Sequence, residues 1–317
     1  RVDLTLFSEK IQELKDRITS VIVGQEQTVD LVLTAILANG HVLIEGVPGV
    51  AKTLLARLTA RLIDADFSRV QFTPDLMPSD VLGTTVFNMK TNGFDFHQGP
   101  IFADIVLVDE INRAPAKTQA ALFEVMEERQ ISIDGTTHRM GDLYTILATQ
   151  NPVEQEGTYK LPEAQLDRFL MKITMDYPSL EEEVNILERH HTNAALVKLD
   201  DIVPAITKEE LLSLRAFMNQ VFVDRTLLQY IALIVQQTRT SKAVYLGASP
   251  RASVAMLQSS KAYALLQGRD FVTPEDIKFV APYVLQHRLI LTAEAEMEGY
   301  SPVKVTQRLI DKVEVPK

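Results

Sequence analysis

The fold is decided by residues 41–53, which read His-Val-Leu-Ile-Glu-Gly-Val-Pro-Gly-Val-Ala-Lys-Thr. The apolar run over His41–Glu45 predicts a buried strand, and a helical pattern begins directly after the glycine-rich turn. A strand, a Gly-x-x-x-x-Gly-Lys-Ser/Thr turn and a helix together form a phosphate-binding loop, since loop N–H groups and the helix N-terminus present partial positive charge. Ala51 replaces the second glycine of this pattern, which the loop tolerates because Ala51 need only avoid a strongly positive φ.

A second motif follows at residues 105–110, Ile-Val-Leu-Val-Asp-Glu. Four consecutive apolar residues are typical of a strand buried on both faces of a parallel sheet, and ligands bind at the carboxyl ends of such strands. This placement predicts that Asp109 holds Mg²⁺ through a water molecule and that Glu110 polarises the water that attacks a γ-phosphate. In the first motif, Lys52 supplies a mobile positive charge for the β- and γ-phosphates, and the Thr53 hydroxyl supplies a ligand for Mg²⁺.

Strands and helices alternate between residues 41 and 174, which predicts a three-layer α/β core with a parallel sheet. Two insertions interrupt the alternation, Thr84–His97 and Gln130–Met140, and their Asn-Gly and Asp-Gly pairs predict projecting β-hairpins. The other predicted strands are Arg69–Phe72, Tyr144–Ala148 and Phe169–Thr174.

The strand pattern disappears after about residue 200, and helix starts take its place. A capping box begins at Thr207, Asp224 precedes a second apolar helical pattern, and Ser-Pro and Thr-Pro pairs at 249–250 and 273–274 predict two more starts. We therefore predict an α/β core over residues 1–195 and an all-α helical domain over residues 196–317.

The composition is that of an ordinary globular protein, with 46% hydrophobic residues, 23% charged residues and no cysteine. No apolar run reaches the roughly 18 residues of a membrane span, and Arg1–Lys10 lacks an apolar signal core, so we expect a cytoplasmic protein. The net charge of −10 disfavours nucleic acid as the main partner, because nonspecific binding depends on neutralising phosphates. The six histidines show no metal-ligand spacing.

Together these motifs resemble the AAA+ ATPases, and more closely the MoxR family. The resemblance is carried by Gly46–Thr53, Asp109–Pro115, Ala148–Pro152 with Glu154–Tyr159, Leu161–Phe169 and Gly247–Ala252. Relatives of the MoxR type commonly carry alanine in place of the last loop glycine, so Ala51 supports the subfamily. The resemblance implies a P-loop core with a helical lid, hydrolysis of ATP with Mg²⁺, and a homo-oligomeric ring expected to be hexameric.

The resemblance also assigns roles to single residues. Asn151 matches the sensor-1 position, which orients the lytic water, and Arg168 matches the arginine finger, which reaches the neighbouring subunit's nucleotide. Arg251 matches sensor 2, and the sequence leaves open whether it acts on its own nucleotide or on the neighbour's. Ile22 and Val23 resemble the segment that packs on adenine, although core packing explains them equally well.

The complete expected site is as follows. The residues expected to act in catalysis are Lys52, Glu110, Asn151, Arg168 and Arg251. The residues expected to bind nucleotide are Ile22, Val23, Gly46, Val47, Pro48, Gly49, Val50, Ala51, Lys52, Thr53, Leu54, Asp109 and Arg251, and those expected to hold Mg²⁺ are Thr53 and Asp109.

MoxR-like ATPases are associated with chaperone-like remodelling, maturation or metal-cofactor insertion of client protein complexes, often beside a partner with a von Willebrand factor A domain. One alternative is a DNA or RNA translocase, which predicts basic hairpins; here Lys90, Arg129 and Arg139 are opposed by Asp95, Asp134 and Asp142. Another alternative is a scaffold that binds ATP without turnover. The presence of Glu110, Asn151 and Arg168 argues against it.

Overall fold

The computed structural model describes residues 3–46, 51–151, 161–192 and 198–317. Its centre is a five-stranded sheet in the order β2-β5-β8-β1-β9, in which every neighbouring pair is parallel. The strands are β1 (Val42–Gly46), β2 (Phe67–Gln71), β5 (Ile105–Asp109), β8 (Thr145–Gln150) and β9 (Met171–Met175). All five strands lie where the sequence predicts them, within one or two residues.

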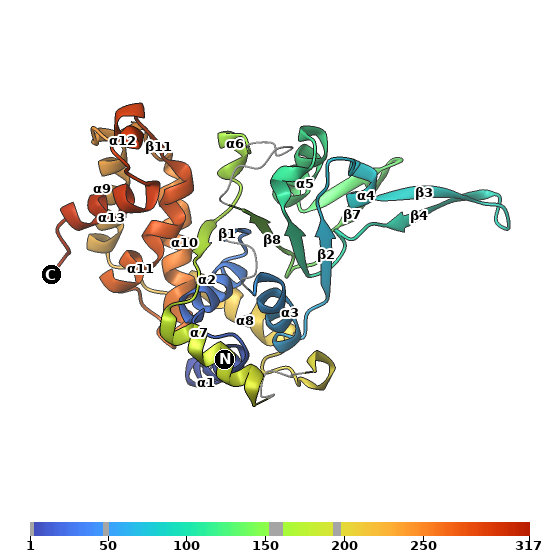
Figure 1. The fold of residues 1–317 in the computed structure, drawn as a ribbon, viewed down its shortest axis with the longest axis horizontal. Coiled ribbons are helices and arrows are strands. Elements are labelled where there is room, and N and C mark those ends of the chain that lie inside the picture. Colours follow the sequence, from blue (N-terminus) through green and yellow to red (C-terminus); the bar gives the residue numbers. More distant parts are fainter. Residues whose placement is uncertain (1–2, 47–50, 152–160, 193–197) are drawn as a thin grey trace.

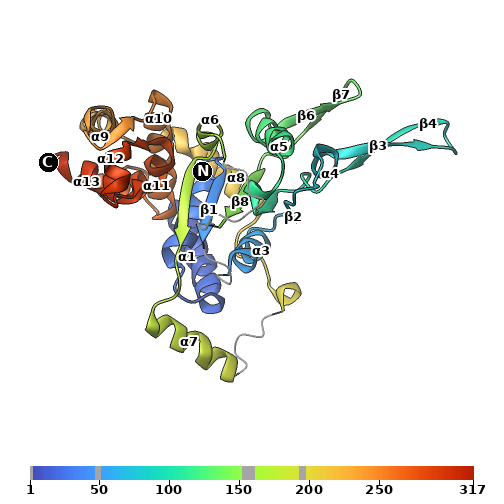
Figure 2. The same ribbon diagram turned by 45° about the horizontal axis from the view of Figure 1, so that its top comes forward.

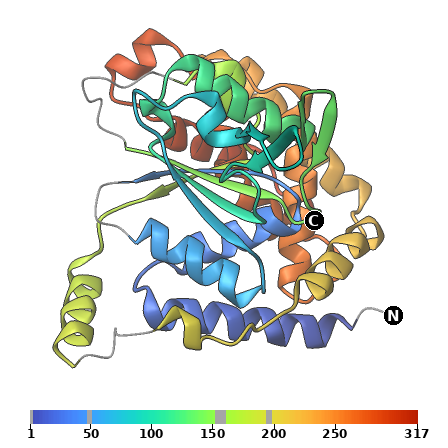
Figure 3. The same cartoon turned by 90° about the vertical axis from the view of Figure 1, so that its right-hand side faces the viewer.

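Helices cover both faces of the sheet, as Figure 3 shows with the strands seen side-on. On one face, Val42 and Ile44 pack in a cluster with α1 (Leu4–Val21), α2 (Glu26–Leu37) and α3 (Lys52–Leu62). On the other, Leu43 packs in a second cluster with α5 (Ala116–Glu128). Alternate residues of one strand therefore enter different cores, which confirms the three-layer prediction.

Both predicted hairpins are present. They are β3 (Gly83–Asn88) with β4 (Gly93–Gln98), preceded by the short helix α4 (Pro78–Leu82), and β6 (Gln130–Ile133) with β7 (Thr136–Arg139). Asn92 and Asp134 have φ values of 52°, the left-handed backbone that such turns require. The β3–β4 hairpin projects far from the body of the molecule (Figure 1). At their bases the hairpins contact each other, where the rings of Phe96 and His138 stack with centroids 4.5 Å apart.

The C-terminal part is mainly helical, as predicted. Its helices are α8 (Lys208–Phe217), α9 (Arg225–Thr240), α10 (Pro250–Leu266), α11 (Pro274–Leu285), α12 (Ala293–Met297) and α13 (Pro302–Lys312). Thr207, Asp224 and Thr273 accept N-cap hydrogen bonds, whereas Ser249 caps α10 without one. The sequence analysis did not predict the short antiparallel ribbon of β10 (Val244–Leu246) and β11 (Ile290–Leu291) in this part.

Two further helices flank β9 in the chain. Helix α6 (Glu163–Leu166) precedes β9, and α7 (Leu180–His191) follows it. The chain after residue 198 first returns to the α/β core, where Ala205 N donates to Leu62 O at 2.8 Å and Arg215 Nε donates to Leu37 O at 3.2 Å. One hydrophobic cluster runs through both parts, and the division between residues 195 and 196 stays a prediction.

Within the described ranges, the molecule has no helix that combines the length and the apolar character needed to cross a bilayer. The same part of the chain contains no cluster of histidine and acidic side chains suited to a metal ion.

His41 directly precedes β1 and is buried, and its contacts predict that the fold loses stability in acid. Its Nδ1 accepts from Ile146 N at 3.0 Å, so the neutral ring carries its proton on Nε2 and donates to Met126 O at 2.9 Å. Burial, helped by the nearby Arg129 charge, lowers the pKa of His41 from 6.5 to about 3. Because the unfolded chain takes up this proton first, the free energy of unfolding should fall as pH drops from 6.5 toward 3, by up to about 1.4 kcal/mol per pH unit.

Denaturant unfolding at pH 7.5, 6.5 and 5.5 measures this slope. The His41→Gln variant should lose part of it, whatever its stability at pH 7.5, whereas the control His191→Gln, on the exposed end of α7, should keep it. Equal slopes in His41→Gln and the unaltered protein would contradict a neutral buried His41.

Candidate nucleotide-binding site

The residues expected to hold nucleotide phosphates gather at one edge of the sheet. We call it the carboxyl edge, where the parallel strands end. Strand β1 ends at Gly46 and β5 at Asp109, and Asn151 directly follows β8. Lys52 and Thr53 are the first two residues of α3. Val47, Pro48, Gly49 and Val50 lie outside the described residues, so the expected backbone cradle is not part of the description.

Lys52 lies within electrostatic reach of both carboxylates of the second motif. Its Nζ donates to Gly46 O at 3.1 Å. Burial lowers the pKa of Lys52, and the negative charges of Asp109 and Glu110 oppose that shift. The partly buried ammonium group can bind an anion, and the two carboxylates can bind a cation. The arrangement therefore suits an anionic ligand that binds together with a cation.

Asp109 is buried and held from two sides. Arg69 Nε donates to Oδ2 at 2.5 Å, and Thr149 Oγ1 donates to Oδ1 at 3.2 Å. A carboxylate and the Thr53 hydroxyl are hard oxygen donors, which suit Mg²⁺. The donor chemistry therefore fits the expected metal, and the engagement of both Asp109 oxygens favours contact through water.

Glu110 has an unusual backbone, with φ and ψ both 54°, in the left-handed region that non-glycine residues rarely adopt. Its N–H donates to Thr149 Oγ1 at 3.0 Å, so one buried hydroxyl holds both motif residues. The Glu110 Oε2 atom accepts from Arg113 at 3.0 Å and from Gln71 at 3.2 Å. These contacts fix the carboxylate at the end of β5.

Sequence reasoning missed Arg69, Gln71 and Thr149. A signal existed for the first two, because residues two apart on a strand share a face, and β2 is the neighbour of β5 with Gln71 opposite Asp109. Thr149 lies in the stretch that carries the family resemblance, but no spacing rule assigns it a partner.

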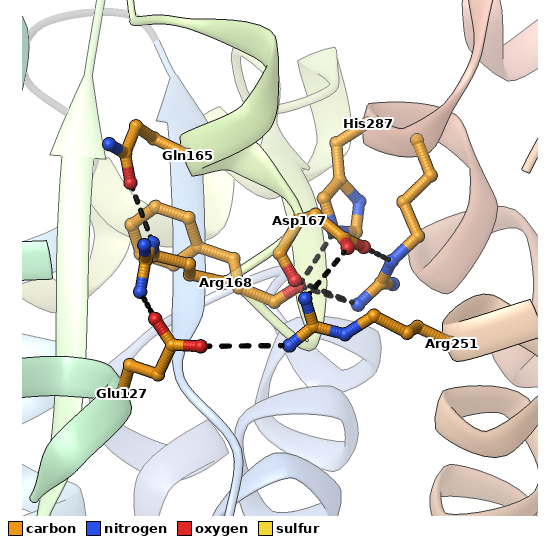
Figure 4. A network of polar contacts seen from close by, with 8 residues as sticks. Glu127, Gln165, Asp167, Arg168, Arg251 and His287 are labelled. Atoms are coloured by element: carbon orange, nitrogen blue, oxygen red, sulfur yellow. Dashed lines mark hydrogen bonds and ion pairs between the residues drawn. The ribbon is translucent and has the colours of Figure 1, made fainter. Parts of the chain in front are cut away.

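Arg168 and Arg251 lie at the opposite edge of the sheet, which we call the amino edge, where the strands begin (Figure 4). Arg168 precedes β9, and Arg251 is the second residue of α10. Arg168 Nε donates to Gln165 Oε1 at 2.6 Å, and its guanidinium pairs with Glu127 at the end of α5. It does not pair with its sequence neighbours Asp167 or Glu163 among the ion pairs of the described residues.

Glu127 brings the two arginines together. Arg251 lies 3.9 Å from a Glu127 oxygen and 3.7 Å from an Asp167 oxygen, with 69% of its side chain exposed. These long, exposed contacts are weak. Beside them opens a cavity of about 440 Å³, lined among others by Glu127, Arg129, Arg168, Arg251 and Val254.

The two groups of predicted residues are therefore separated by the length of the strands. Strand β1 has five residues, which span about 16 Å at the usual rise per residue. Lys52, Asp109 and Glu110 lie at one end, and Arg168 and Arg251 at the other.

Of the residues expected near adenine, Ile22 is 4% exposed and belongs to the main hydrophobic cluster. Val23 is half-buried. Leu54, expected only among the nucleotide-binding residues, packs against the same cluster. Ile22 therefore has a packing role in the fold, and the adenine contact stays a prediction.

Comparisons with known proteins define the class of this fold and site. Residues 41–171 match the ATPase family associated with various cellular activities (AAA), and residues 236–311 match the AAA lid domain. The fold is also that of a Cytophaga hutchinsonii protein of known crystal structure, with a TM-score of 0.90, 40% identity, and coverage of 99% of this chain and 97% of that one. The protein is thus an AAA ATPase with a lid.

The relatives narrow the class. The chain is 44% identical over 306 residues to chaperone MoxR1 of Mycobacterium tuberculosis, covering 94% of this chain and 80% of that protein. It is 30% identical over 317 residues to the MoxR protein of Methylorubrum extorquens, covering 93% and 91%. The uncharacterized protein YeaC of Bacillus subtilis is 47% identical over 301 residues, covering 95% and 93%. The chain belongs to the MoxR family of AAA ATPases.

Thr149 offers a test of the carboxyl edge. Thr149→Val keeps the shape of the side chain but removes the hydroxyl that binds Asp109 and the Glu110 N–H. We expect a loss of about 1–3 kcal/mol in the free energy of unfolding and a roughly 10-fold lower rate of ATP turnover.

Thr145→Val is the matched control. Thr145 is a buried threonine on the same strand, and its Oγ1 donates to Leu143 O at 2.9 Å near the amino edge. It should lose stability to a similar degree and keep its turnover rate. If both variants lose turnover equally when folded, Thr149 has no special part in the site.

Proposed function

We propose that this ATPase hydrolyses MgATP between neighbouring copies of a ring, and that the cycle drives remodelling of client protein complexes. One observation carries the proposal: the phosphate-facing residues and the two arginines lie at opposite edges of one parallel sheet. The residues of one chain cannot therefore all meet at one triphosphate, and a neighbouring copy has to complete the site.

The carboxyl edge is proposed to bind the nucleotide. The residues from Gly46 to Leu54 would bind the phosphates, with Lys52 serving the β- and γ-phosphates. Mg²⁺, bound by Thr53 and through water by Asp109, would neutralise phosphate charge. Glu110 would accept a proton from the attacking water, and Asn151 would orient that water.

The amino edge is proposed to serve the next subunit. Arg168 would act as the arginine finger on the neighbour's γ-phosphate, where such a charge is worth roughly 10³–10⁵ in rate. Arg251 shares Glu127 with Arg168 and lies on the same edge, so it also acts on the neighbour's nucleotide. The sequence left this choice open, and the shared Glu127 supports action on the neighbour.

The proposal that the protein acts on protein clients rests on its likeness to MoxR1 and on the exposed tip of the β3–β4 hairpin. MoxR1 of Mycobacterium tuberculosis is named a chaperone, and by likeness we propose chaperone-like maturation or metal-cofactor insertion, with a von Willebrand factor A domain partner. The tip of the β3–β4 hairpin exposes Met89 and Phe94, at 87% and 73%. An apolar tip is better suited to contact a protein client than to contact a phosphate backbone. Arg129, one of the basic residues that a translocase would use on nucleic acid, is engaged within the fold. Its guanidinium donates to Tyr144 O and Asn39 O, which favours protein clients over nucleic acid.

Turnover is tested by Glu110→Gln, which removes the proton acceptor and keeps the shape. We expect steady-state phosphate release to fall by about 100-fold or more, with ATP binding retained. The control Glu128→Gln changes an exposed carboxylate on α5 and should leave the rate unchanged. Equal phosphate release by Glu110→Gln and the unaltered protein would remove Glu110 from the chemistry.

Complementation between variants tests the shared site. Arg168→Ala and Lys52→Ala should each be inactive alone, but a mixture should recover part of the turnover, because some junctions combine an intact Lys52 with an intact Arg168. The exposed-site control Arg225→Ala should be active alone.

The same design decides where Arg251 acts. If Arg251 serves the neighbour, Arg251→Ala should be rescued by Lys52→Ala and not by Arg168→Ala, since both arginine defects then lie at the same edge. Rescue by Arg168→Ala would show that Arg251 serves its own nucleotide. No recovery in any mixture would count against a site shared between copies.

A further inference from the structure

Helix α7 (Leu180–His191) leaves an apolar face without a partner. None of its twelve residues is buried. Leu180, Val184 and Leu187 recur at helical spacing and are 82%, 45% and 64% exposed, and Tyr177 just before the helix is 72% exposed. We call these four residues the α7 stripe. Such a stripe is normally the face by which a helix packs.

The opposite side of α7 is attached to the body. Arg189 donates to the carbonyls of Ser20 and Thr19, and Glu182 lies against Gly24, which has a φ of 78°. At 100° per residue, Glu182 and Arg189 lie on the side of the helix away from the stripe. Figure 2 shows α7 at the periphery of the molecule. The helix is therefore held in place with its apolar side turned outward.

The position of α7 indicates what would cover it. The helix follows the carboxyl end of β9 and contacts Thr19, Ser20 and Gly24, which flank the segment expected to pack on adenine. It lies on the carboxyl-edge side, which under the proposed function faces the amino edge of the next copy. There Val254, 59% exposed, lies one turn after Arg251 and lines the 440 Å³ cavity.

The two surfaces also have opposite charge. Helix α7 carries four glutamates and one arginine. The lining of the amino-edge cavity includes four arginines and two acidic residues. Acidic flanks beside the stripe disfavour an anionic lipid surface and favour this arginine-rich face, since complementary charge directs association.

We propose that the α7 stripe docks on a second copy of this chain, on the amino edge beside Val254 of α10. The inference rests on the proposed function, because the two surfaces lie on opposite edges of one subunit. Such a head-to-tail contact closes into a ring when the rotation allows. It would bury the stripe and bring Arg168 and Arg251 of one copy toward the nucleotide of the next.

Cross-linking tests the contact directly, because the natural chain has no cysteine. Copies carrying Val184→Cys and copies carrying Val254→Cys, mixed with ATP and oxidised mildly, should form a disulfide-linked pair. The control Met297→Cys lies on α12 and is 88% exposed. Mixed with Val254→Cys, it should form none. Equal yields in the two mixtures would overturn the proposed contact.

Assembly separates this inference from the proposed function. Leu180→Ser with Leu187→Ser should raise the protein concentration for half-assembly, measured by sedimentation with ATP, at least 10-fold. Binding of a fluorescent ATP analogue should be unchanged, and Met297→Ser is the control. If the unaltered protein assembles and the double variant assembles equally well, the proposed α7 contact is refuted, whereas the proposed ring is not. If the unaltered protein hydrolyses ATP but never assembles, both the proposed ring and the proposed α7 contact are refuted.

Discussion

The common direction of the five strands is the constraint on which the rest of this structure depends. Because all neighbours in the sheet are parallel, every strand begins at one edge and ends at the other. The carboxyl ends of β1 and β5 lead into Lys52 and Thr53 of α3 and carry Asp109 and Glu110, whereas Arg168 precedes β9 and Arg251 reaches the same amino edge from α10. The proposed site shared between copies rests on this separation of the two sets of residues.

The amino edge is built jointly by the core and the lid. Three consecutive residues after α11 hold the backbone around Arg168: Gln286 donates to Lys172 O, His287 contacts Phe169 O at 2.8 Å, and Arg288 donates to Asp167 and to the Phe169 and Leu170 carbonyls. Burial lowers the pKa of Arg288, while the bonded Asp167 carboxylate opposes that shift. The loop that carries Arg168 is therefore fixed to the lid, and a lid movement would carry both arginines with it.

Much of this arrangement was predictable from sequence, and the failures have a common cause. Strands such as His41–Glu45 and the Asn-Gly and Asp-Gly hairpins depend on local patterns, and the structure confirms them. The β10–β11 ribbon was missed because strands of three and two residues carry no period. Thr149 and Gln71 act across neighbouring strands, and Arg168 pairs with Glu127 rather than with a neighbour in sequence. Such partners are set by register and packing, which one sequence does not display.

At the amino edge, one carboxylate, that of Glu127, lies between two guanidinium groups. Glu127 offsets the repulsion between two arginines that would otherwise lie close together without a phosphate. The contacts of Arg251 are long and exposed, so they cost little to exchange. A triphosphate on the neighbouring copy carries far more negative charge than one carboxylate, and it would displace Glu127 from at least one guanidinium. Glu127 therefore keeps the two guanidinium groups together in this structure, and under the proposed function a neighbour's nucleotide would take its place.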